Sequence, residues 1–361
     1  MADYRIAVFP GDGIGVEVMS AAMAVLDAVE QRFGVRLIRE AMDGGAAYYR
    51  ETGRDLADGG FEAARQADAI LFGAMGLPDV RLPDGTEVAP HLEMRREFHL
   101  FAGVRPVRKY PNTPAILADE RGEKVDFIVL RESTEGLFAS RGRGTVEDGR
   151  VARDTMEITR DTSIALFDFA FALARRRSKK GRGQRRVTCV DKSNVFVSMA
   201  FFRAIFEERA AHHRDVDATC SYVDAMALDL VRKPWAADVL VMENMFGDIL
   251  SDLGGGLVGG MGMAPCAEIG HRHALFQPAH GSAPDIAGEG IANPTAMLVS
   301  TAMMLDWLGD RAGDARLVEA ADALDEAVWN AYASGAVLPF EVGGQTTTED
   351  MTRAVLAHLK G

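Results

Sequence analysis

The chain has 361 residues, of which 48% are hydrophobic and 26% are charged, and its formal net charge at pH 7 is −13. This composition is typical of a globular protein with a large core and enough chain for two domains. The net negative charge opposes general binding to nucleic acid, and no apolar stretch approaches the length that spans a membrane.

Short β-branched or aromatic runs alternate along the chain with longer stretches of helical periodicity. This alternation predicts an α/β architecture in which helices cover a substantially parallel sheet. We expect buried strands at Arg5–Phe9, Ala69–Gly73, Phe127–Arg131, Val187–Val190 and Val239–Met242, and helices over Val16–Val29, Thr162–Arg177, Val195–Arg209, Ile249–Leu257, Pro294–Leu308 and Arg316–Ser334.

Two regions are candidate crossings between lobes, Leu100–Pro106 and the Gly-rich segment Gly254–Gly262. Glycine permits backbone conformations that other residues avoid, which suits a crossing. Near the C-terminal third, Asn293 followed by Pro294 predicts a helix start in which Asn caps and Pro takes the first helical position.

Gly11-Asp12-Gly13-Ile14-Gly15 follows the first strand and opens the first helix. Its third glycine comes one residue too early for the dinucleotide fingerprint G-x-G-x-x-G. The motif therefore favours a tight strand-to-helix turn over a Rossmann phosphate site.

Three arginines stand near predicted strand ends: Arg95, Arg105 and Arg131. Guanidinium groups bind carboxylates in a bidentate manner, so three of them can hold a dicarboxylate. Three ordinary salt bridges explain the same residues equally well.

A cationic run, Arg175–Arg186, links an apolar helix to a short strand. No aromatic residues are interleaved for base stacking, which favours a solvated connector over a nucleic-acid patch.

Lys192 follows that strand closely, and a lysine in a closed cleft can move protons, although a surface lysine is the simpler interpretation. Asp224 offers an acid after a further strand, or a favourable charge at a helix start.

Asp248 and Asp252 are four residues apart. In a helix this spacing places both carboxylates on one face, where they repel each other unless a cation lies between them. Oxygen ligands suit Mg²⁺ or Mn²⁺ rather than zinc, and two solvated surface acids are the alternative.

His280-Gly281-Ser282-Ala283-Pro284-Asp285 is a loop of small residues with one histidine and one acid. Small residues let a flat ligand approach the backbone, and the acid can accept both ribose hydroxyls while repelling a 2′-phosphate. A plain surface turn is the alternative.

The three cysteines, Cys189, Cys220 and Cys266, show no zinc spacing or disulfide framework, and with no signal-peptide pattern they favour reduced thiols in the cytoplasm.

Together these segments resemble the isocitrate/isopropylmalate dehydrogenase family of β-decarboxylating dehydrogenases, and most of all its NAD-dependent isopropylmalate and tartrate types. The resemblance runs from Gly11 to Thr295 and is strongest in Asn244–Asp252 and His280–Gly288. It implies an α/β, isopropylmalate dehydrogenase-like fold rather than a Rossmann fold, with two α/β domains sharing a large sheet. Residues 1–100 plus 259–361 would form the NAD-binding domain, and residues 101–258 the substrate, metal and dimerisation domain.

The resemblance also implies roles for single residues. Arg95, Arg105 and Arg131 would bind the substrate, Asp248 and Asp252 would bind metal, and Lys192 and Asp224 would reach into the active site of the partner in a homodimer. Asp224 would thus serve catalysis, substrate and metal together. Contacts with NAD would come from Ile14, Glu87, His280, Gly281, Ser282, Ala283, Asp285 and Asn293.

The implied reaction is the NAD-dependent oxidative decarboxylation of a 3-substituted D-malate, with Mg²⁺ or Mn²⁺ as the second cofactor. NAD would take a hydride from C2, Lys192 and Asp224 would help remove the hydroxyl proton, and the metal would polarise the new ketone. Loss of the β-carboxylate would leave an enol. NAD is favoured over NADP because Asp285-Ile286 stands where NADP-using relatives tend to carry Lys-Tyr.

Two positions depart from the family pattern. Phe138 stands where relatives have a tyrosine that delivers a proton to the enol, and phenylalanine has no proton to give. The segment before Arg95 contains His91, which can contact a polar substituent or face solvent. A substrate like isopropylmalate, tartrate, malate or isocitrate therefore stays open, as do a dehydrogenase that does not decarboxylate and a non-catalytic regulatory subunit.

Overall fold

The computed structural model describes residues 3–360, and its chain divides into two compact units. The first unit takes in the residues up to Phe98, the segment Tyr110–Pro114 and the residues from Gly259 on; the second is His99–Lys109 with Ala115–Val258. Both units are mixed α/β, and the main sheet has ten strands. Among residues 3–360, no helix is long and apolar enough to cross a membrane.

The first unit has five strands in the order β2-β1-β3-β12-β11, of which β11 and β12 are antiparallel and the rest parallel. All six residues of β3 are buried, as expected for a central strand with both faces covered. The strands are β1 (Asp3–Gly11), β2 (Arg36–Ala41), β3 (Ala69–Ala74), β11 (Pro265–Ile269) and β12 (Ala274–Pro278).

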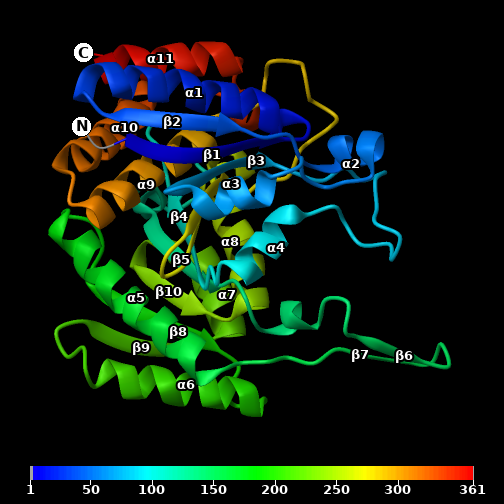
Figure 1. Ribbon diagram of the computed structural model, residues 1–361. Helices are drawn as coiled ribbons and strands as arrows, with labels where there is room; N and C mark the ends of the chain where they lie inside the picture. Colours follow the sequence, from blue (N-terminus) through cyan, green and yellow to red (C-terminus); the bar gives the residue numbers. More distant parts are fainter. Residues whose placement is uncertain (1–2, 361) are drawn as a thin grey trace. The chain divides into compact units, whose positions relative to one another are not determined.

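Helices pack over this part of the sheet, and α1 lies beside α11 although the two stand at opposite ends of the sequence (Figure 1). The long helix α1 ends where Gly34 adopts a left-handed conformation and donates its N–H to Glu30, which is a common helix stop. The helices are α1 (Ile14–Phe33), α2 (Ala46–Thr52), α3 (Gly60–Gln66), α4 (Pro90–Glu97), α9 (Thr295–Ala312), α10 (Ala315–Ala333) and α11 (Thr348–Lys360), with 3-10 turns η4 (Met261–Met263) and η5 (Phe340–Val342).

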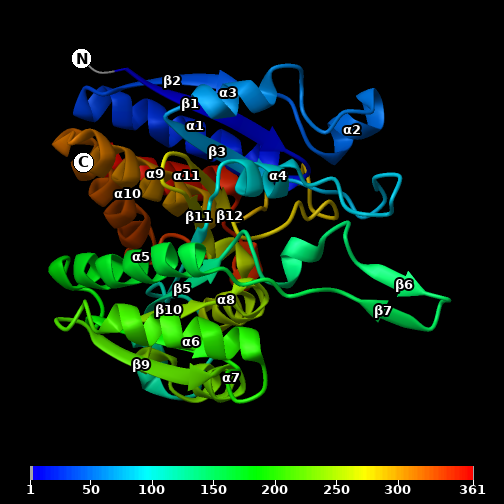
Figure 2. The same ribbon diagram turned by 60° about the horizontal axis from the view of Figure 1, so that its bottom comes forward.

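The second unit has five strands in the order β4-β5-β10-β8-β9, parallel except for the β4–β5 pair. They are β4 (Ala102–Arg108), β5 (Asp126–Glu132), β10 (Val239–Met242), β8 (Arg186–Asp191) and β9 (Asp217–Tyr222). A separate hairpin, β6 (Thr145–Glu147) with β7 (Val151–Arg153), extends away from this sheet (Figure 2).

Helices α5 (Arg160–Lys179) and α6 (Val197–Ala210) pack on each other and on β8, and α7 (Val223–Arg232) and α8 (Asn244–Val258) form the other helical pair of the unit. Aromatic rings fill the space between α5 and α6: the Phe167 and Phe202 centroids are 4.6 Å apart. Short turns η1 (Glu120–Lys124), η2 (Leu137–Ser140) and η3 (Pro234–Ala236) complete the unit.

All five expected strands and all six expected helices are present, most of them longer at one or both ends. Two details differ. Pro294 takes the cap position and α9 starts at Thr295, whose N–H is accepted by the Asn293 side chain at 3.1 Å. The boundary between the two units falls between Val258 and Gly259, inside the expected crossing Gly254–Gly262, although Gly254–Val258 belong to α8. Gly254 lies where a Cβ would meet Val107 Cγ2 at 2.6 Å. That close approach, not flexibility, explains this glycine.

Candidate active site

The glycine motif after β1 is a tight turn fixed by a buried acid. Gly11 and Gly13 have φ values of +80° and +54°, which other residues rarely adopt. The Asp12 carboxylate, 2% exposed, accepts the N–H groups of Ala46, Ala47 and Gly76 at 2.7, 2.8 and 2.8 Å. Because these donors come from two other segments, Asp12 holds the motif to both of them.

The loop His280–Asp285 is joined to this turn. Ile14 donates its N–H to the Ser282 carbonyl at 2.8 Å, and the Ser282 hydroxyl donates to the Gly76 carbonyl. Glu87 lies against Gly76, since a Cβ there would meet its Oε1 at 2.6 Å. Three of the residues assigned to NAD by resemblance are therefore brought together.

Two features of the loop suit a ligand. The Nε2 atom of His280 is buried and has no hydrogen-bond partner among the described residues, while Nδ1 lies 2.9 Å from the Gly281 carbonyl. Burial lowers the pKa of His280, which favours the neutral imidazole. Ala283 has φ +37°, an uncommon value for a residue with a side chain and typical of functional loops, and Asp285 is exposed.

The Glu341 carboxylate holds Asn293, another residue assigned to NAD by resemblance, in place. The sequence motifs do not single out Glu341. Its oxygens accept from the Gly262 N–H at 2.9 Å and from the Asn293 amide at 3.1 Å. A Cβ on Gly260 or Gly262 would meet this carboxylate at 2.3 Å. Glu341 is 48 residues from Asn293, so no local motif announces the contact.

Arg95 belongs to the same unit and is directed toward an internal acid. It is 5% exposed, and its guanidinium pairs with the fully buried Glu268 at 2.7 Å. A buried arginine and carboxylate stabilise each other because each offsets the charge that the other takes out of water.

Arg105 and Arg131 lie in the second unit with both aspartates of α8. Arg105 Nη1 is 3.5 Å from Asp248 Oδ1 and 4.0 Å from Asp252 Oδ1, and it donates to Ser251 Oγ at 2.6 Å. Arg131 forms an ion pair with Asp248. Strands β4 and β5 thus bring two guanidiniums to the face of α8 that carries the two carboxylates.

Helix α8 fits closely over Arg131. The Asn244 side-chain oxygen accepts from Arg131 Nε and Nη2 at 2.9 and 2.6 Å. Gly247 lies where a Cβ would meet Arg131 Cβ and Cγ, both at 2.6 Å. The first turn of α8 therefore fixes the direction of the guanidinium.

The two aspartates fit a hard divalent cation as part of a ligand set. Their side chains are 46% and 62% exposed, so both can reach a ligand. Burial raises the pKa of Asp252, and the nearby Asp248 carboxylate adds to that rise, as expected for two acids that a cation would stabilise. Within residues 3–360 of one chain, no three His, Cys, Asp or Glu side chains are grouped to hold a metal.

Lys192 and Asp224 form a pair at the ends of two neighbouring strands. Lys192 Nζ donates to Asp224 Oδ1 at 2.6 Å, and this hydrogen bond lowers the pKa of Asp224. Lys192 comes just after β8, and Asp224 opens α7 directly after β9. The parallel pairing of β8 with β9 is what brings these two residues together.

Phe138 lies in η2 with its ring 5.0 Å from Arg131 Cζ, a cation–π arrangement. Its side chain is therefore next to a candidate substrate arginine. His91 is in ring contact with Phe72, at 5.8 Å between centroids.

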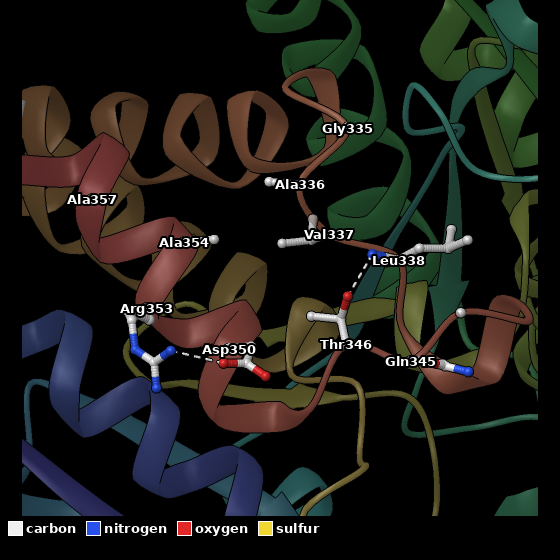
Figure 3. A pocket seen from close by; sticks show the side chains of 11 residues that line it. Gly335, Ala336, Val337, Leu338, Gln345, Thr346, Asp350, Arg353, Ala354 and Ala357 are labelled. Carbon is white, nitrogen blue, oxygen red and sulfur yellow. Dashed lines mark hydrogen bonds and ion pairs between the residues drawn. The ribbon is translucent and has the colours of Figure 1, made fainter.

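A hollow that contains none of these residues lies near the C-terminus (Figure 3). It is lined by small and apolar residues on either side of η5 and by α11. The Leu338 N–H donates to Thr346 Oγ1 at 2.7 Å, and Arg353 is paired with Asp350 at 2.8 Å. Its charged rim is internally paired, so it does not extend the candidate site.

The cationic run Arg175–Arg186 is paired with acids of its own unit. Arg177 binds the buried Asp238 at 2.9 Å, Arg182 binds Asp126 at 2.9 Å, and Arg175 binds Asp215 at 2.6 Å. These contacts attach the connector between α5 and β8 to the sheet.

An α/β fold with arginines facing paired carboxylates, a lysine–aspartate pair and a glycine-rich loop defines a class of enzyme that handles small carboxylic acids. Residues 5–355 match the model of the isocitrate/isopropylmalate dehydrogenase family. The chain belongs to that family, and it is a dehydrogenase of the isopropylmalate and tartrate type.

Three relatives illustrate the match. The 3-isopropylmalate dehydrogenase of Methanothermobacter thermautotrophicus is 39% identical over 100% of both chains. The tartrate dehydrogenase/decarboxylase of Pseudomonas putida is 37% identical over 98% of this chain and 96% of its own. The crystal structure of isocitrate dehydrogenase from Methylococcus capsulatus superposes with a TM-score of 0.86 at 32% identity, covering 99% of this chain and 100% of that one, which confirms the expected fold.

Proposed function

We propose that this protein is a cytoplasmic homodimer that uses NAD and Mg²⁺ or Mn²⁺ to oxidise and decarboxylate a 3-substituted D-malate. One observation carries the proposal: Arg105 of β4 and Arg131 of β5 lie against the face of α8 that carries Asp248 and Asp252. Positive groups for carboxylates and negative groups for a cation stand side by side, as a chelated hydroxy acid requires. Relatives named for isopropylmalate and for tartrate support this substrate class.

In the proposed site, Arg105 and Arg131 bind substrate carboxylates. Each guanidinium is buried, at 6% and 2% exposure, so a charge-assisted hydrogen bond to the substrate is little screened by water. Asn244 and Gly247 keep Arg131 in one orientation, which lowers the cost of ordering it when substrate binds. A bound Mg²⁺ or Mn²⁺, held by Asp248, Asp252 and a partner's Asp224, would supply a Lewis acid for the hydroxyl oxygen.

The Lys192–Asp224 pair is proposed to move the hydroxyl proton. The 2.6 Å hydrogen bond to Asp224 holds Lys192 Nζ in place, and a lysine that gives up its own proton when substrate binds can then take the hydroxyl proton. Oxidation makes a ketone next to the carbon that bears the β-carboxylate, so loss of that group as CO₂ leaves an enol. The enol carbon then needs a proton.

The first unit is proposed to bind NAD, which would accept a hydride from C2 of the substrate. His280, whose Nε2 has no hydrogen-bond partner among the described residues, belongs to one loop with Ser282 and Asp285. Ile14 donates its N–H to that loop, and Glu87 lies against Gly76, which accepts from Ser282. An exposed acid such as Asp285 can accept ribose hydroxyls and repels a 2′-phosphate, which supports NAD over NADP.

A substrate panel tests the proposal. Purified protein with Mn²⁺ and NAD would be offered 3-isopropylmalate, D-malate, D-tartrate and isocitrate, with NADH followed by absorbance and CO₂ by trapping. We expect NADH from at least one acid, abolition by a chelator, and restoration by Mn²⁺. No NADH from any of them would contradict the proposal and favour a regulatory subunit.

A second candidate, oxidation without decarboxylation, is favoured by one observation: Phe138 lies beside Arg131 and has no proton to give. The same panel separates the two functions. Equal amounts of NADH and CO₂ indicate decarboxylation, whereas NADH without CO₂ indicates a simple oxidation.

A further inference from the structure

Cys189 and Cys220 stand directly opposite each other on neighbouring parallel strands. The register of β8 and β9 pairs Cys189 with Cys220. Paired strands are about 4.8 Å apart, and disulfides join Cα atoms separated by about 4.4–6.8 Å. Both side chains therefore leave the same face of the sheet at a separation that a disulfide can bridge.

The two thiols also differ in a way that assigns them separate roles. Cys220 is exposed on β9, at the end of the strand order, and it lines a hollow with Thr219 and Ser221, so a small oxidant can reach it. Cys189 is fully buried. A hydrogen bond from the Cys189 side chain lowers the pKa of Cys220, and the Arg203 guanidinium acts in the same direction. Exposed, acidified thiols next to a second thiol are the ones that peroxides oxidise.

We propose that Cys220 and Cys189 are a peroxide-sensitive pair that closes to a reversible disulfide. The Cys220 thiolate attacks one peroxide oxygen, becoming a sulfenic acid and, after proton uptake by the leaving group, releasing water. The Cys189 sulfur then attacks the Cys220 sulfur, its proton leaves with the hydroxyl as a second water, and the disulfide forms. Two thiols and one hydrogen peroxide thus give one disulfide and two waters.

The strands that carry this pair also carry the proposed proton-moving residues. Lys192 lies three residues beyond Cys189, and Asp224 lies four residues beyond Cys220. Between them, Asp191 accepts from Arg203 at 2.7 and 3.0 Å and from the Ser193 N–H at 2.7 Å, and Cys189 Sγ lies 3.8 Å from its Oδ2. A disulfide pulls Cys189 Sγ toward Cys220, away from this contact, and so disturbs the segment that positions Lys192.

Thiol counting on the full-length protein tests the disulfide. Reduced protein would be treated with hydrogen peroxide, denatured, alkylated and weighed. We expect the number of free thiols to fall from the three in the sequence to one, and dithiothreitol to restore all three. Peptide mapping should show Cys189 joined to Cys220 within one chain.

Matched variants give each cysteine its own readout. Cys220→Ser, at an exposed position, should keep both remaining thiols after peroxide. Cys189→Ser should let the Cys220 sulfenic acid accumulate, seen as increased labelling by dimedone. The Cys266→Ser variant, which changes the buried cysteine of the other unit, should still lose its two remaining thiols on treatment with peroxide. Three free thiols in the treated wild type, or a crosslink between two chains, would contradict the proposed disulfide within one chain.

The effect on turnover rests on the proposed function. We expect the oxidised protein to form NADH about tenfold more slowly, because small displacements of reacting groups cost rates of this order or more. Dithiothreitol should reverse the loss, and Cys220→Ser should not show it. A disulfide with unchanged turnover would overturn the regulatory effect. A protein inactive in both states would contradict the proposed function, while the thiol count would still decide the disulfide.

Discussion

Arg131 is held on one side by Asn244 and Asp248 and covered on another by the Phe138 ring, 5.0 Å from its Cζ. A tyrosine here would place a hydroxyl beside the same guanidinium. General acids typically contribute about 10²–10⁴-fold to a rate. We therefore expect Phe138→Tyr to raise the rate at which the decarboxylated product forms by about tenfold or more. CO₂ and NADH, followed in parallel, measure this rate.

The control is Phe201→Tyr, which adds the same hydroxyl to a phenylalanine of equal exposure, 40%, on α6. It should leave the rate unchanged. If Phe138→Tyr also leaves both rate and product as they were, protonation at this position does not limit the reaction.

Some contacts of single residues could be predicted from the sequence, and others could not. The four-residue spacing of Asp248 and Asp252 predicts a shared helix face, because helix geometry is local. The pairing of Arg95 with Glu268, or of Asn293 with Glu341, joins residues 173 and 48 positions apart and depends on which strands and turns meet. A buried acid such as Glu268 can be located only after its burial is known.

Helix α8 contains one glycine that packs tightly against another side chain and one that faces open space. A Cβ on Gly247 would meet Arg131 at 2.6 Å, whereas a Cβ on the exposed Gly256 would meet nothing within 4 Å. We expect Gly247→Ala to lower the free energy of unfolding by about 1–3 kcal/mol through overpacking, and to raise the KM for substrate by moving Arg131.

Gly256→Ala is the matched control in the same helix. It should raise the free energy of unfolding by about 0.5–1 kcal/mol, because alanine loses less conformational entropy in a helix, and it should leave KM unchanged. Urea titrations and initial rates measure both quantities. Equal stability for the two variants would show that α8 does not pack on Arg131 as described.

Element patterns explain which parts of the fold the sequence predicts. Strands such as β3 are uninterrupted apolar runs, and long helices such as α10 keep their period, so both are recognisable. Strand β2 has one buried residue among six and no clear alternation, and β11 and β12 begin or end with proline, so their own residues do not predict these strands. Their strand character comes from pairing with neighbours rather than from their own residues.

At the scale of the molecule, the second unit exposes apolar side chains that a homodimer would cover. Leu228 and Val231 on α7 and Ile249 on α8 are 54%, 51% and 60% exposed, and Val146 on the hairpin is 72% exposed. Helices α7 and α8 pack on each other, and large exposed apolar side chains on neighbouring elements are typical of an interface. This exposure supports the proposal that Lys192 and Asp224 act in the partner's site.

Mixed dimers test whether the sites are shared. Lys192→Met and Asp252→Asn should each lower turnover by about 100-fold or more, since each removes a group that contacts substrate or metal. Co-expressed, the two chains should regain about one quarter of wild-type activity, because in a two-fold dimer half of the random pairs are mixed and each mixed pair has one intact shared site. Lys192→Met mixed with Asp224→Asn should stay inactive, because those residues enter the same site from one chain. If the first mixture is as inactive as the second, each chain completes its own site, and the proposed exchange of Lys192 and Asp224 between partners is wrong.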